Sequence, residues 1–498
     1  MKEVRVRFAP SPTGALHIGG IRTALYNYLF AKQHNGTFYL RIEDTDQTRH
    51  DPNAEKYIYD ALAWLGISPD ETVNKNERFA PYRQSERTDI YKKHINRLVQ
   101  TGNAYYAFDS TTDLENERSN AENAKMTFVY NHSTRTRLQN SFTLSDVEVQ
   151  TRLQKNEPFV IRFKNPKNET LSLHDLIRGE VTFETSLLDD KILYKSDGMP
   201  TYHFANVVDD HLMQTSHVIR GEEWLPSLPL HYMLYRSFGW TAPIFAHLPL
   251  ILKPIGNGKL SKRDGEKLGF PVFPLAWNSS LGYREQGYFP EAVINFLALL
   301  GWNDGTEQEI FSVAELIKKF DLHKVHKSGA KFNPEKNNWF NHQYMQQQDN
   351  EKLAALFSKI VADKGYPSDI KKLTTIVSKI KDRANFVNDF WQLSSYLFEP
   401  PQKYEEKALK NWTSETTSNL RYISTILTTI TNFTSKNIES TVQNWSTTND
   451  ISIEKIMPAL RLALVGSLTG INVFDIIEII GKEDTVTRLH TATTTINS

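Results

Sequence analysis

The first 30 residues change from a strand-like period of two to a helical period across a proline-rich turn. Val4, Val6 and Phe8 alternate with arginines, which predicts a short strand. Residues 10–14 read PSPTG, and two prolines with a glycine predict a loop. Apolar side chains then recur at helical spacing between residues 18 and 29. Such a strand–loop–helix unit is a building block of parallel α/β sheets.

The next segments repeat this order. Phe38, Leu40 and Ile42 alternate with other residues after the break at Gly36, and Asp51-Pro52 is typical of a helix start. The resulting order of strand, helix, strand and helix predicts a parallel sheet with crossover helices, as in Rossmann-type nucleotide-binding domains.

The pattern is interrupted before it resumes. Residues 111–145 are polar and irregular, and short strand-like runs follow at residues 159–163 and 181–183. Segments of the first type return near Gly198 and continue to Lys262. We therefore expect a nucleotide-binding α/β domain that contains an inserted α+β module.

The C-terminal part of the chain has a helical pattern. Apolar spacing is helical beyond Pro290, and no glycine occurs between Gly365 and Gly466. A chain of 498 residues is too long for one ordinary hydrophobic core. The length and the change of pattern together predict three or more domains.

Composition excludes several classes of site and location. The chain has no cysteine, which rules out disulfides, thiolate-bound zinc, iron–sulfur clusters and a cysteine nucleophile. No apolar run reaches the roughly 18–20 residues of a membrane span, and the N-terminus lacks a signal-peptide pattern, so we expect a cytoplasmic protein. With 58 basic and 58 acidic side chains, any nucleic-acid surface must be local.

Two short motifs could bind phosphate. Residues 16–20 read LHIGG at the predicted start of a helix, where unpaired N–H groups and the helix dipole favour an anion. His17 could donate a hydrogen bond to phosphate, although it could also act as a simple helix cap. Residues 259–263 read KLSKR after a glycine-rich turn, and Lys259 and Lys262 could close over a triphosphate. Taken alone, the second motif could be an ordinary solvated loop.

The two motifs resemble the His-Ile-Gly-His and Lys-Met-Ser-Lys-Ser signatures of class I aminoacyl-tRNA synthetases. Four longer strings make the chain similar to bacterial-type glutamyl-tRNA synthetases: residues 7–14 (RFAPSPTG), 41–46 (RIEDTD), 197–203 (DGMPTYH) and 218–224 (VIRGEEW). The resemblance covers almost the whole chain and weakens in residues 111–157 and 345–450.

The chain departs from these signatures at a few positions. Gly20 stands where the first motif has histidine, and Leu260 and Arg263 replace methionine and serine in the second. Some relatives hold zinc through cysteines after the equivalent of Tyr105-Tyr106. Because residues 107–109 read AFD here, we expect no structural zinc.

The resemblance also implies roles for individual residues. Glutamate needs an arginine for each carboxylate and an acidic partner for its ammonium group. We expect Arg7 to bind the side-chain carboxylate and Glu43 the ammonium group. The expected catalytic residues are His17, Gly19, Lys259 and Lys262. The expected ATP-binding residues are Thr13, His17, Gly19, Gly20, Glu223, Trp224 and Lys262. The expected glutamate-binding residues are Arg7, Ser11, Glu43, Tyr202, Asn206 and Arg220.

The expected domains follow from the motifs and the resemblance. Residues 1–84 and 196–265 form the Rossmann-type catalytic domain, and residues 85–195 form the inserted module that binds the tRNA acceptor end. Residues 266–340 form an α-helical stem-contact domain, which contains Tyr283 and Asn337 in two family-like strings. Residues 341–498 form a helical anticodon-binding domain.

The implied activity is glutamate–tRNA ligation, with L-glutamate, ATP and tRNA-Glu as reactants and Mg²⁺ bound to the ATP phosphates. We expect a monomer that holds no metal through its own side chains and does not bind a membrane. An enzyme that also charges tRNA-Gln is the nearest alternative. A glutaminyl-tRNA synthetase would have a β-rich anticodon module, and a glutamyl-queuosine synthetase would be shorter. A nucleotidylyltransferase would not need about 230 residues after the second motif. A silent tRNA-binding paralogue would not need His17, Lys259 and Lys262.

Overall fold

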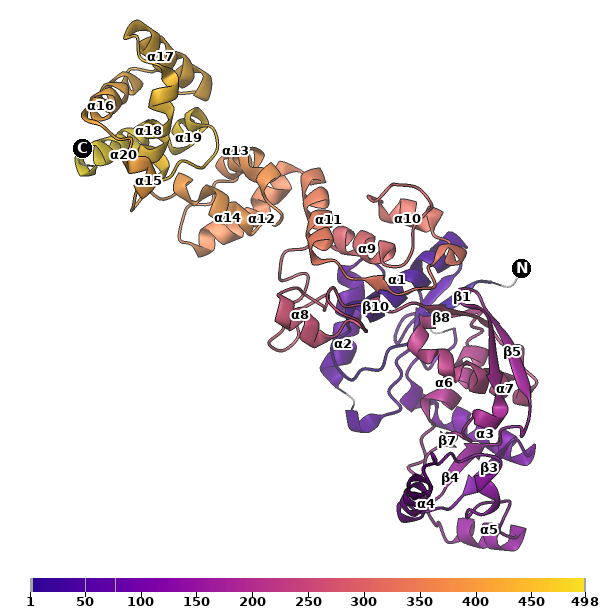
Figure 1. Cartoon of the computed structure of the whole chain (residues 1–498). Helices are drawn as coiled ribbons and strands as arrows, with labels where there is room; N and C mark the ends of the chain where they lie inside the picture. Colours follow the sequence, from indigo (N-terminus) through magenta and orange to yellow (C-terminus); the bar gives the residue numbers. More distant parts are fainter. Residues whose placement is uncertain (1–2, 50, 77, 497–498) are drawn as a thin grey trace. The chain divides into compact units, whose positions relative to one another are not determined.

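The first strand–loop–helix unit lies where the sequence predicts it. In this computed structural model, which describes residues 3–49, 51–76 and 78–496, β1 (Arg5–Phe8) leads through the proline loop to α1 (Ile18–Gln33). β1 pairs in parallel with β2 (Thr37–Leu40), and α1 packs against both strands (Figure 1). Asp51 caps α2 (Pro52–Trp64) by accepting a hydrogen bond from the Asn53 N–H. The predicted parallel strands with a crossover helix are confirmed.

The chain forms two compact units, Met1–Asn337 and Asn338–Ser498. The further strands are β3 (Ala104–Ala107), β4 (Val160–Phe163), β5 (Thr170–Asp175), β6 (Gly179–Glu184), β7 (Ile192–Tyr194), β8 (His217–Gly221), β9 (Ile244–Leu248), β10 (Ile251–Leu252) and β11 (Ala330–Lys331). The further helices of the first unit are α3 (Thr88–Gln100), α4 (Thr111–Asn123), α5 (Asp146–Gln154), α6 (Tyr202–Leu212), α7 (Leu228–Phe238), α8 (Lys262–Leu268), α9 (Pro290–Leu299) and α10 (Val313–Lys319).

A mixed sheet with the order β6-β5-β9-β8 continues the α/β fold. β8, β9 and β5 run in parallel, and β6 joins the edge as the second strand of a hairpin. At the start of β8, Ser216 donates its N–H to the Arg5 carbonyl of β1 at 2.9 Å. The carboxyl ends of β1 and β8 therefore lie at one edge, where α/β folds bind their ligands.

The segment expected as an inserted module divides between two sheets. β3, β4 and β7 form an antiparallel sheet of their own, whereas β5 and β6 are hydrogen-bonded to β9. Side chains of α3, α6 and α7 share one buried core with β4 and β5. Residues 170–184 thus belong to the catalytic sheet by their hydrogen bonds.

Residues 111–145 are more regular than their sequence pattern predicts. α4 occupies residues 111–123, and a reciprocal capping box between Ser110 and Asp113 starts it. No side chain of α4 is buried, so the helix lacks the apolar periodicity on which the prediction relied. The expectation of an irregular segment was wrong at this point.

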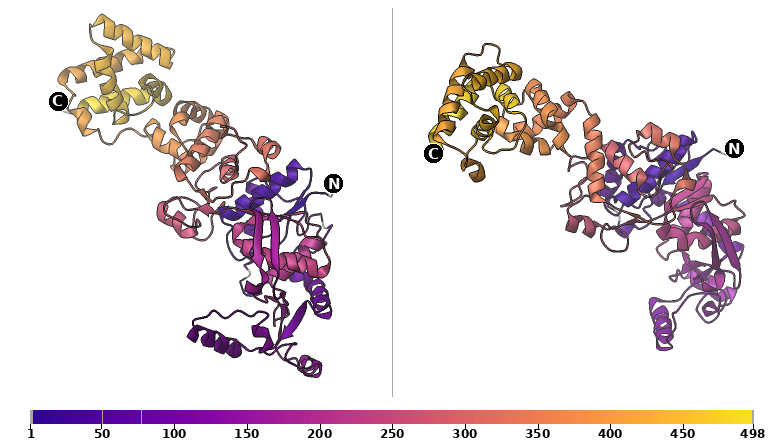
Figure 2. Two further views of the ribbon diagram at one scale, coloured as in Figure 1. Left: turned by 45° about the vertical axis from the view of Figure 1, so that its right-hand side comes forward. Right: turned by 45° about the horizontal axis from the view of Figure 1, so that its top comes forward.

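The second unit is helical throughout the part that the structure describes (Figure 2). α11 (Pro334–Gln347) spans the junction between the units. The remaining helices are α12 (Asn350–Asp363), α13 (Ile370–Ile380), α14 (Asp389–Ser394), α15 (Glu406–Leu409), α16 (Ser414–Thr428), α17 (Ser435–Thr448), α18 (Ile453–Val465), α19 (Val473–Ile480) and α20 (Lys482–Thr495). None of the described helices has the length and apolar character that crossing a membrane requires.

Candidate active site

One cavity of about 940 Å³ gathers nearly all of the predicted site residues. It opens at the carboxyl ends of β1, β2 and β8. The predicted residues on its wall are Arg7, Ser11, Thr13, His17, Gly19, Gly20, Glu43, Tyr202, Asn206, Arg220, Glu223, Trp224 and Lys259. Lys262 lies outside this lining.

His17 is both a helix cap and a free hydrogen-bond donor. It is the N-cap of α1, and its Nδ1 accepts a hydrogen bond from the Gly19 N–H at 3.1 Å. Burial, reinforced by the nearby Lys259, lowers the pKa of His17 to about 4, so the imidazole is neutral at physiological pH. Because Nδ1 accepts, the proton is on Nε2, which is buried and has no partner among the described residues. That N–H can bind a phosphate oxygen.

The backbone at the start of α1 does not supply the free N–H groups that the sequence pattern predicts. Ile18 donates its N–H to the Val272 carbonyl at 2.9 Å. Gly20 and Ile21 both donate to the His17 carbonyl, at 2.8 and 3.1 Å. With Gly19 bonded to the imidazole, the first turn is fully paired. The dipole of α1 remains available to an anion, but its N–H groups do not.

Gly20 has a steric explanation that differs from ligand approach. A Cβ at this position would lie 2.8 Å from Cδ1 of Leu16 and 3.8 Å from the Phe8 ring. A histidine, as in the class signature, would require Leu16 to move. At Gly19 a Cβ would meet only His17 Nδ1, at 3.5 Å, which is an ordinary contact.

The two lysines of the second motif lie on either side of the start of α8. Lys259 is on the cavity wall, and its Nζ is 2.8 Å from Oε1 of Glu223. Lys262 is the first residue of α8 and lies 3.5 Å from Glu266. Its Nζ is 5.9 Å from the centre of the Phe273 ring, which also makes an edge contact with the His17 ring at 6.2 Å. Phe273 therefore links Lys262 to the first motif.

Arg7 is held in place by a buried carboxylate. Its Nε and Nη2 donate to the two oxygens of Asp210 in α6, at 3.0 and 3.1 Å. Arg41 donates to the same carboxylate at 2.8 Å. All three side chains are buried. No hydrogen bond among the described residues uses Nη1 of Arg7, so that end of the guanidinium can bind a carboxylate of the ligand.

Glu43 follows β2 and is a buried carboxylate on the cavity wall. Its Oε1 accepts hydrogen bonds from Arg41 at 2.8 Å and from Asn206 at 3.1 Å. Burial raises the pKa of Glu43 despite the opposing effect of Arg41. Oε2 has no partner in these bonds and can accept from an ammonium group.

Arg220 is the most extensively bonded of the predicted residues. Its Nε donates to His247 at 3.0 Å, and Nη1 lies 3.3 Å from both Tyr202 Oη and His231 Nδ1. Nη2 donates to the Trp224 carbonyl at 3.3 Å. A guanidinium has five N–H donors, so one remains for a ligand without rearrangement.

The aromatic and loop residues complete the wall. The rings of Tyr202 and Trp224 lie 4.3 Å apart between their centres. Ser11 and Thr13 are exposed on the proline loop, where the Thr13 N–H donates to the Ser11 carbonyl at 2.9 Å.

The wall also contains charged residues that are not among the predicted site residues. Asp46 and Arg49 pair at 2.7 Å, and Lys195 pairs with Asp197 at 2.8 Å. Asp46 closes the 41–46 string, and Lys195 precedes the 197–203 string. Adjacency to those strings was the available signal. His231, His247 and Asp210 carried no signal, because only the tertiary structure brings them to the arginines.

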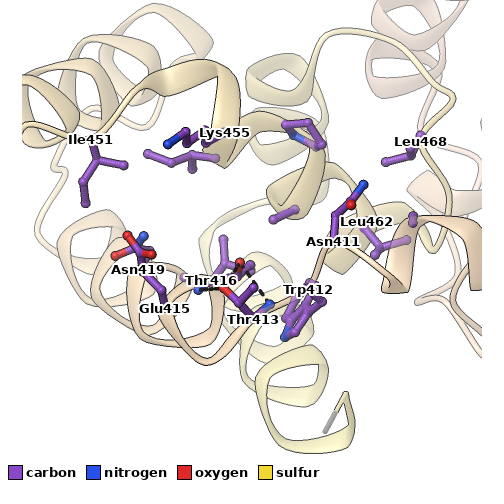
Figure 3. Close-up of a pocket in the computed structure, with 15 residues that line it drawn as sticks. Asn411, Trp412, Thr413, Glu415, Thr416, Asn419, Ile451, Lys455, Leu462 and Leu468 are labelled. Atoms are coloured by element: carbon purple, nitrogen blue, oxygen red, sulfur yellow. Dashed lines mark hydrogen bonds between the residues drawn. The ribbon is translucent and has the colours of Figure 1, made fainter. Parts of the chain in front are cut away.

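A second cavity, of about 400 Å³, lies in the helical unit between α16 and α18 (Figure 3). Thr416 and Asn419 face it from α16, and Lys455 faces it from α18. Its lining contains one cation, Lys455, and one carboxylate, Glu415. It therefore lacks the paired arginines and the histidine of the first cavity.

Comparison with known proteins agrees with this arrangement. Residues 3–339 match the family model of class I tRNA synthetases (E and Q), catalytic domain, and residues 345–493 match an anticodon binding domain. A glutamate–tRNA ligase of Flavobacterium psychrophilum is 62% identical, over 99% of this chain and 100% of that protein. One of Porphyromonas gingivalis is 52% identical over 99% and 98%.

A solved structure is similar over its full length. The glutamate–tRNA ligase of Elizabethkingia meningosepticum, crystallised in complex with its amino acid, has 48% sequence identity and a TM-score of 0.97. The similarity covers 100% of both chains. Each of these three relatives is named a glutamate–tRNA ligase. The chain therefore belongs to the class I tRNA synthetases for glutamate and glutamine, within the glutamate–tRNA ligase family.

Proposed function

We propose that this protein joins L-glutamate to tRNA-Glu with ATP, through a glutamyl-adenylate. The observation that supports it is the single cavity in which Arg7, Arg220 and Glu43 lie beside His17. Two arginines and one carboxylate match the two carboxylates and one ammonium group of glutamate. His17 adds a neutral donor for a phosphate oxygen in the same space.

The first step needs no general base, because the α-carboxylate of glutamate is already a nucleophile. One of its oxygens bonds to the α-phosphorus of ATP. The bond from that phosphorus to the bridging oxygen breaks, and pyrophosphate leaves with the electron pair. His17 Nε2–H and the dipole of α1 stabilise the charge on the phosphate oxygens, and Lys259 and Lys262 neutralise pyrophosphate. A terminal ribose hydroxyl of the tRNA, the 2′ hydroxyl by resemblance, then attacks the carbonyl carbon, and AMP leaves.

Magnesium would accompany the ATP phosphates and offset their charge. In the parts of the chain that the structure describes, no group of three histidine, aspartate or glutamate side chains is arranged to hold a metal ion. The resemblance assigns magnesium to the substrate phosphates, and we name no protein ligands for it.

Selectivity for glutamate over glutamine follows from the same arginines. Glutamine would place an uncharged amide against Arg7, so a charge-assisted bond would be lost. The adenine and ribose of ATP are assigned to the Glu223 and Trp224 side of the cavity. The phosphates are assigned to Thr13 and to the dipole end of α1 at Gly19 and Gly20, whose own N–H groups are already paired. These assignments rest on the resemblance and on the shared wall.

The rest of the chain would bind the tRNA. We assign residues 85–195 to the acceptor end, residues 266–340 to the stem and residues 341–498 to the anticodon. Tyr283 and Asn337, from the two family-like strings, are buried and meet through a hydrogen bond of 3.2 Å, which supports the packing of both strings into one stem-contact domain. Charging of tRNA-Gln as well as tRNA-Glu is the alternative scope. A monomeric state and a cytoplasmic location stay predictions.

ATP–pyrophosphate exchange tests the proposal. We expect exchange to require glutamate and tRNA-Glu together, and Lys262→Ala to lower it by about two orders of magnitude or more. Lys267→Ala is the matched control, since Lys267 is an exposed lysine of the same helix. Exchange supported by glutamine, or equal activity of the two variants, would overturn the proposal. Adding tRNA-Gln to a glutamylation assay decides whether the protein charges tRNA-Glu alone or tRNA-Gln as well.

A further inference from the structure

Three side chains from three neighbouring strands form a buried line that ends at the active-site cavity. Asp175 is the last residue of β5, His247 lies in β9, and Arg220 lies in β8. Arg220 and His247 are direct neighbours in the parallel register of β8 and β9. Asp175 and His247 are fully buried, and Arg220 is 5% exposed. The line is therefore shielded from water up to the guanidinium.

The hydrogen bonds along this line specify the position of one proton. Oδ2 of Asp175 lies 2.6 Å from Nδ1 of His247, and a carboxylate can only accept. Nε of Arg220 lies 3.0 Å from Nε2 of His247, and a guanidinium can only donate. His247 must therefore carry its proton on Nδ1 and present a lone pair at Nε2. Burial and the adjacent Arg220 keep the pKa of His247 below its ordinary value, against the pull of Asp175.

We propose that Asp175 and His247 are positioning residues, which orient the Arg220 guanidinium for a carboxylate of glutamate by holding His247 in its Nδ1–H tautomer. This inference rests on the proposed role of Arg220 in glutamate binding. His247 supplies the bond to Nε, the innermost of the five donors. The outer nitrogens are then left facing Tyr202, His231, Trp224 and the ligand.

Asparagine at position 175 would reverse the tautomer. Oδ1 of Asp175 accepts the backbone N–H groups of Ile177, Arg178 and His247, at 3.0, 2.9 and 3.3 Å. An amide NH₂ at the position of Oδ1 would face these three N–H donors. The asparagine oxygen should therefore take that position, and its NH₂ the position of Oδ2. There it would donate to Nδ1 of His247. The proton of His247 would then be on Nε2, directly opposite the N–H of Arg220.

Kinetics of tRNA glutamylation test the inference. We expect Asp175→Asn to raise the KM for glutamate about 10- to 100-fold, the effect of one lost charge-assisted hydrogen bond. The KM values for ATP and tRNA should change less than about threefold. A purely structural defect in the sheet would affect all three substrates together.

A second variant, His247→Gln, distinguishes an effect of Asp175 through the tautomer of His247 (the relay) from a general structural role of Asp175. His247→Gln keeps an acceptor for Arg220 that does not depend on a tautomer, so adding Asp175→Asn to it should change the glutamate KM less than about threefold. An equal effect of Asp175→Asn in both backgrounds would overturn the inference. His247→Asn keeps the donor to Asp175 and loses the acceptor, so its glutamate KM should exceed that of His247→Gln. The reverse order would also refute it.

A spectroscopic measurement separates this inference from the proposed function. In ¹⁵N-histidine spectra of the full-length protein, with His247 assigned from the His247→Gln variant, we expect the Nδ1–H tautomer, and the Nε2–H tautomer after Asp175→Asn. A His247 proton on Nε2 in the unaltered protein would refute the relay. If the unaltered protein formed no glutamyl-tRNA, the proposed function would fail while the tautomer could still be measured.

Discussion

Replacing Asp210 with asparagine should destabilise the first unit by about 3–5 kcal/mol, the cost of leaving a buried charge without its partner. Asp210 is buried and accepts hydrogen bonds from Arg7, from Arg41 at 2.8 Å and from Thr215 at 3.2 Å. Asp210 is hydrogen-bonded to two buried guanidinium groups. Arg41 also pairs with Glu43 at 2.8 Å and lies 3.8 Å from Asp209, so the loss falls mainly on Arg7. The substitution keeps the size of the side chain, so it changes charge and hydrogen bonding without leaving a cavity.

The geometry also predicts how the asparagine will sit. Oδ1 of Asp210 accepts from three donors, and Oδ2 accepts only from Arg7 Nη2 at 3.1 Å. The amide oxygen should therefore replace Oδ1, and the amide NH₂ should oppose Arg7. One bond becomes a donor–donor contact while the carboxylate charge is lost. Both changes act on the arginine assigned to the side chain of glutamate.

Hydrogen exchange can measure this effect inside one molecule. If exchange follows opening of the first unit, amides of β1 and α6 should exchange about a hundred- to several-thousandfold faster in Asp210→Asn, at 1.36 kcal/mol for each tenfold change. Amides of α16 and α20 in the second unit serve as the internal reference. Asp60→Asn is the matched control, because Asp60 pairs with Lys56 on the surface at 2.5 Å.

The pH dependence gives a further check with a definite sign. Burial alone would raise the pKa of Asp210, but Arg7 and Arg41 outweigh it and hold the pKa below its ordinary value. A depressed pKa contributes stability above the pKa of the unfolded chain, about 3.9, and that stability disappears as pH falls through the folded value. The two proteins should therefore differ at pH 7 and converge in acid. Exchange in β1 no faster than in Asp60→Asn would refute the reasoning.

Three further predictions concern the site. Arg7→Lys should lower kcat/KM for glutamate about 100-fold or more and weaken the preference over glutamine, because one ammonium cannot serve Asp210 and the ligand together; an unchanged glutamate-to-glutamine ratio would contradict this. The His17 imidazole signals, assigned with His17→Asn, should not titrate between pH 5.5 and 8, as its pKa is about 4, whereas a midpoint near 6.5 would disprove the burial argument. The raised pKa of Glu43 should place the acid limb of kcat/KM for glutamate above pH 4.5, and Glu43→Gln should remove that limb.

Local sequence was sufficient for the first strand and helix, and the motif strings contain most of the cavity wall. Alternation at residues 4–8 and helical spacing from residue 18 predicted β1 and α1, since both patterns depend only on near neighbours along the chain. Of the predicted site residues that line the cavity, all but Asn206 lie in one of the motif strings. α4 was missed because an exposed helix held by its capping box has no apolar period.

The tertiary structure decided which partner each polar group has. The Val272 carbonyl accepts the N–H of Ile18, so the helix start that the sequence predicts as an anion site is already hydrogen-bonded. Asp210 supports Arg7, and His247 with Asp175 supports Arg220, across separations of up to 203 residues. Such partners depend on strand order and register, which no local period encodes. The sequence alone determined which side chains are able to bind phosphate and carboxylate groups. Only the folded sheet decided which of their hydrogen bonds remain free to do so.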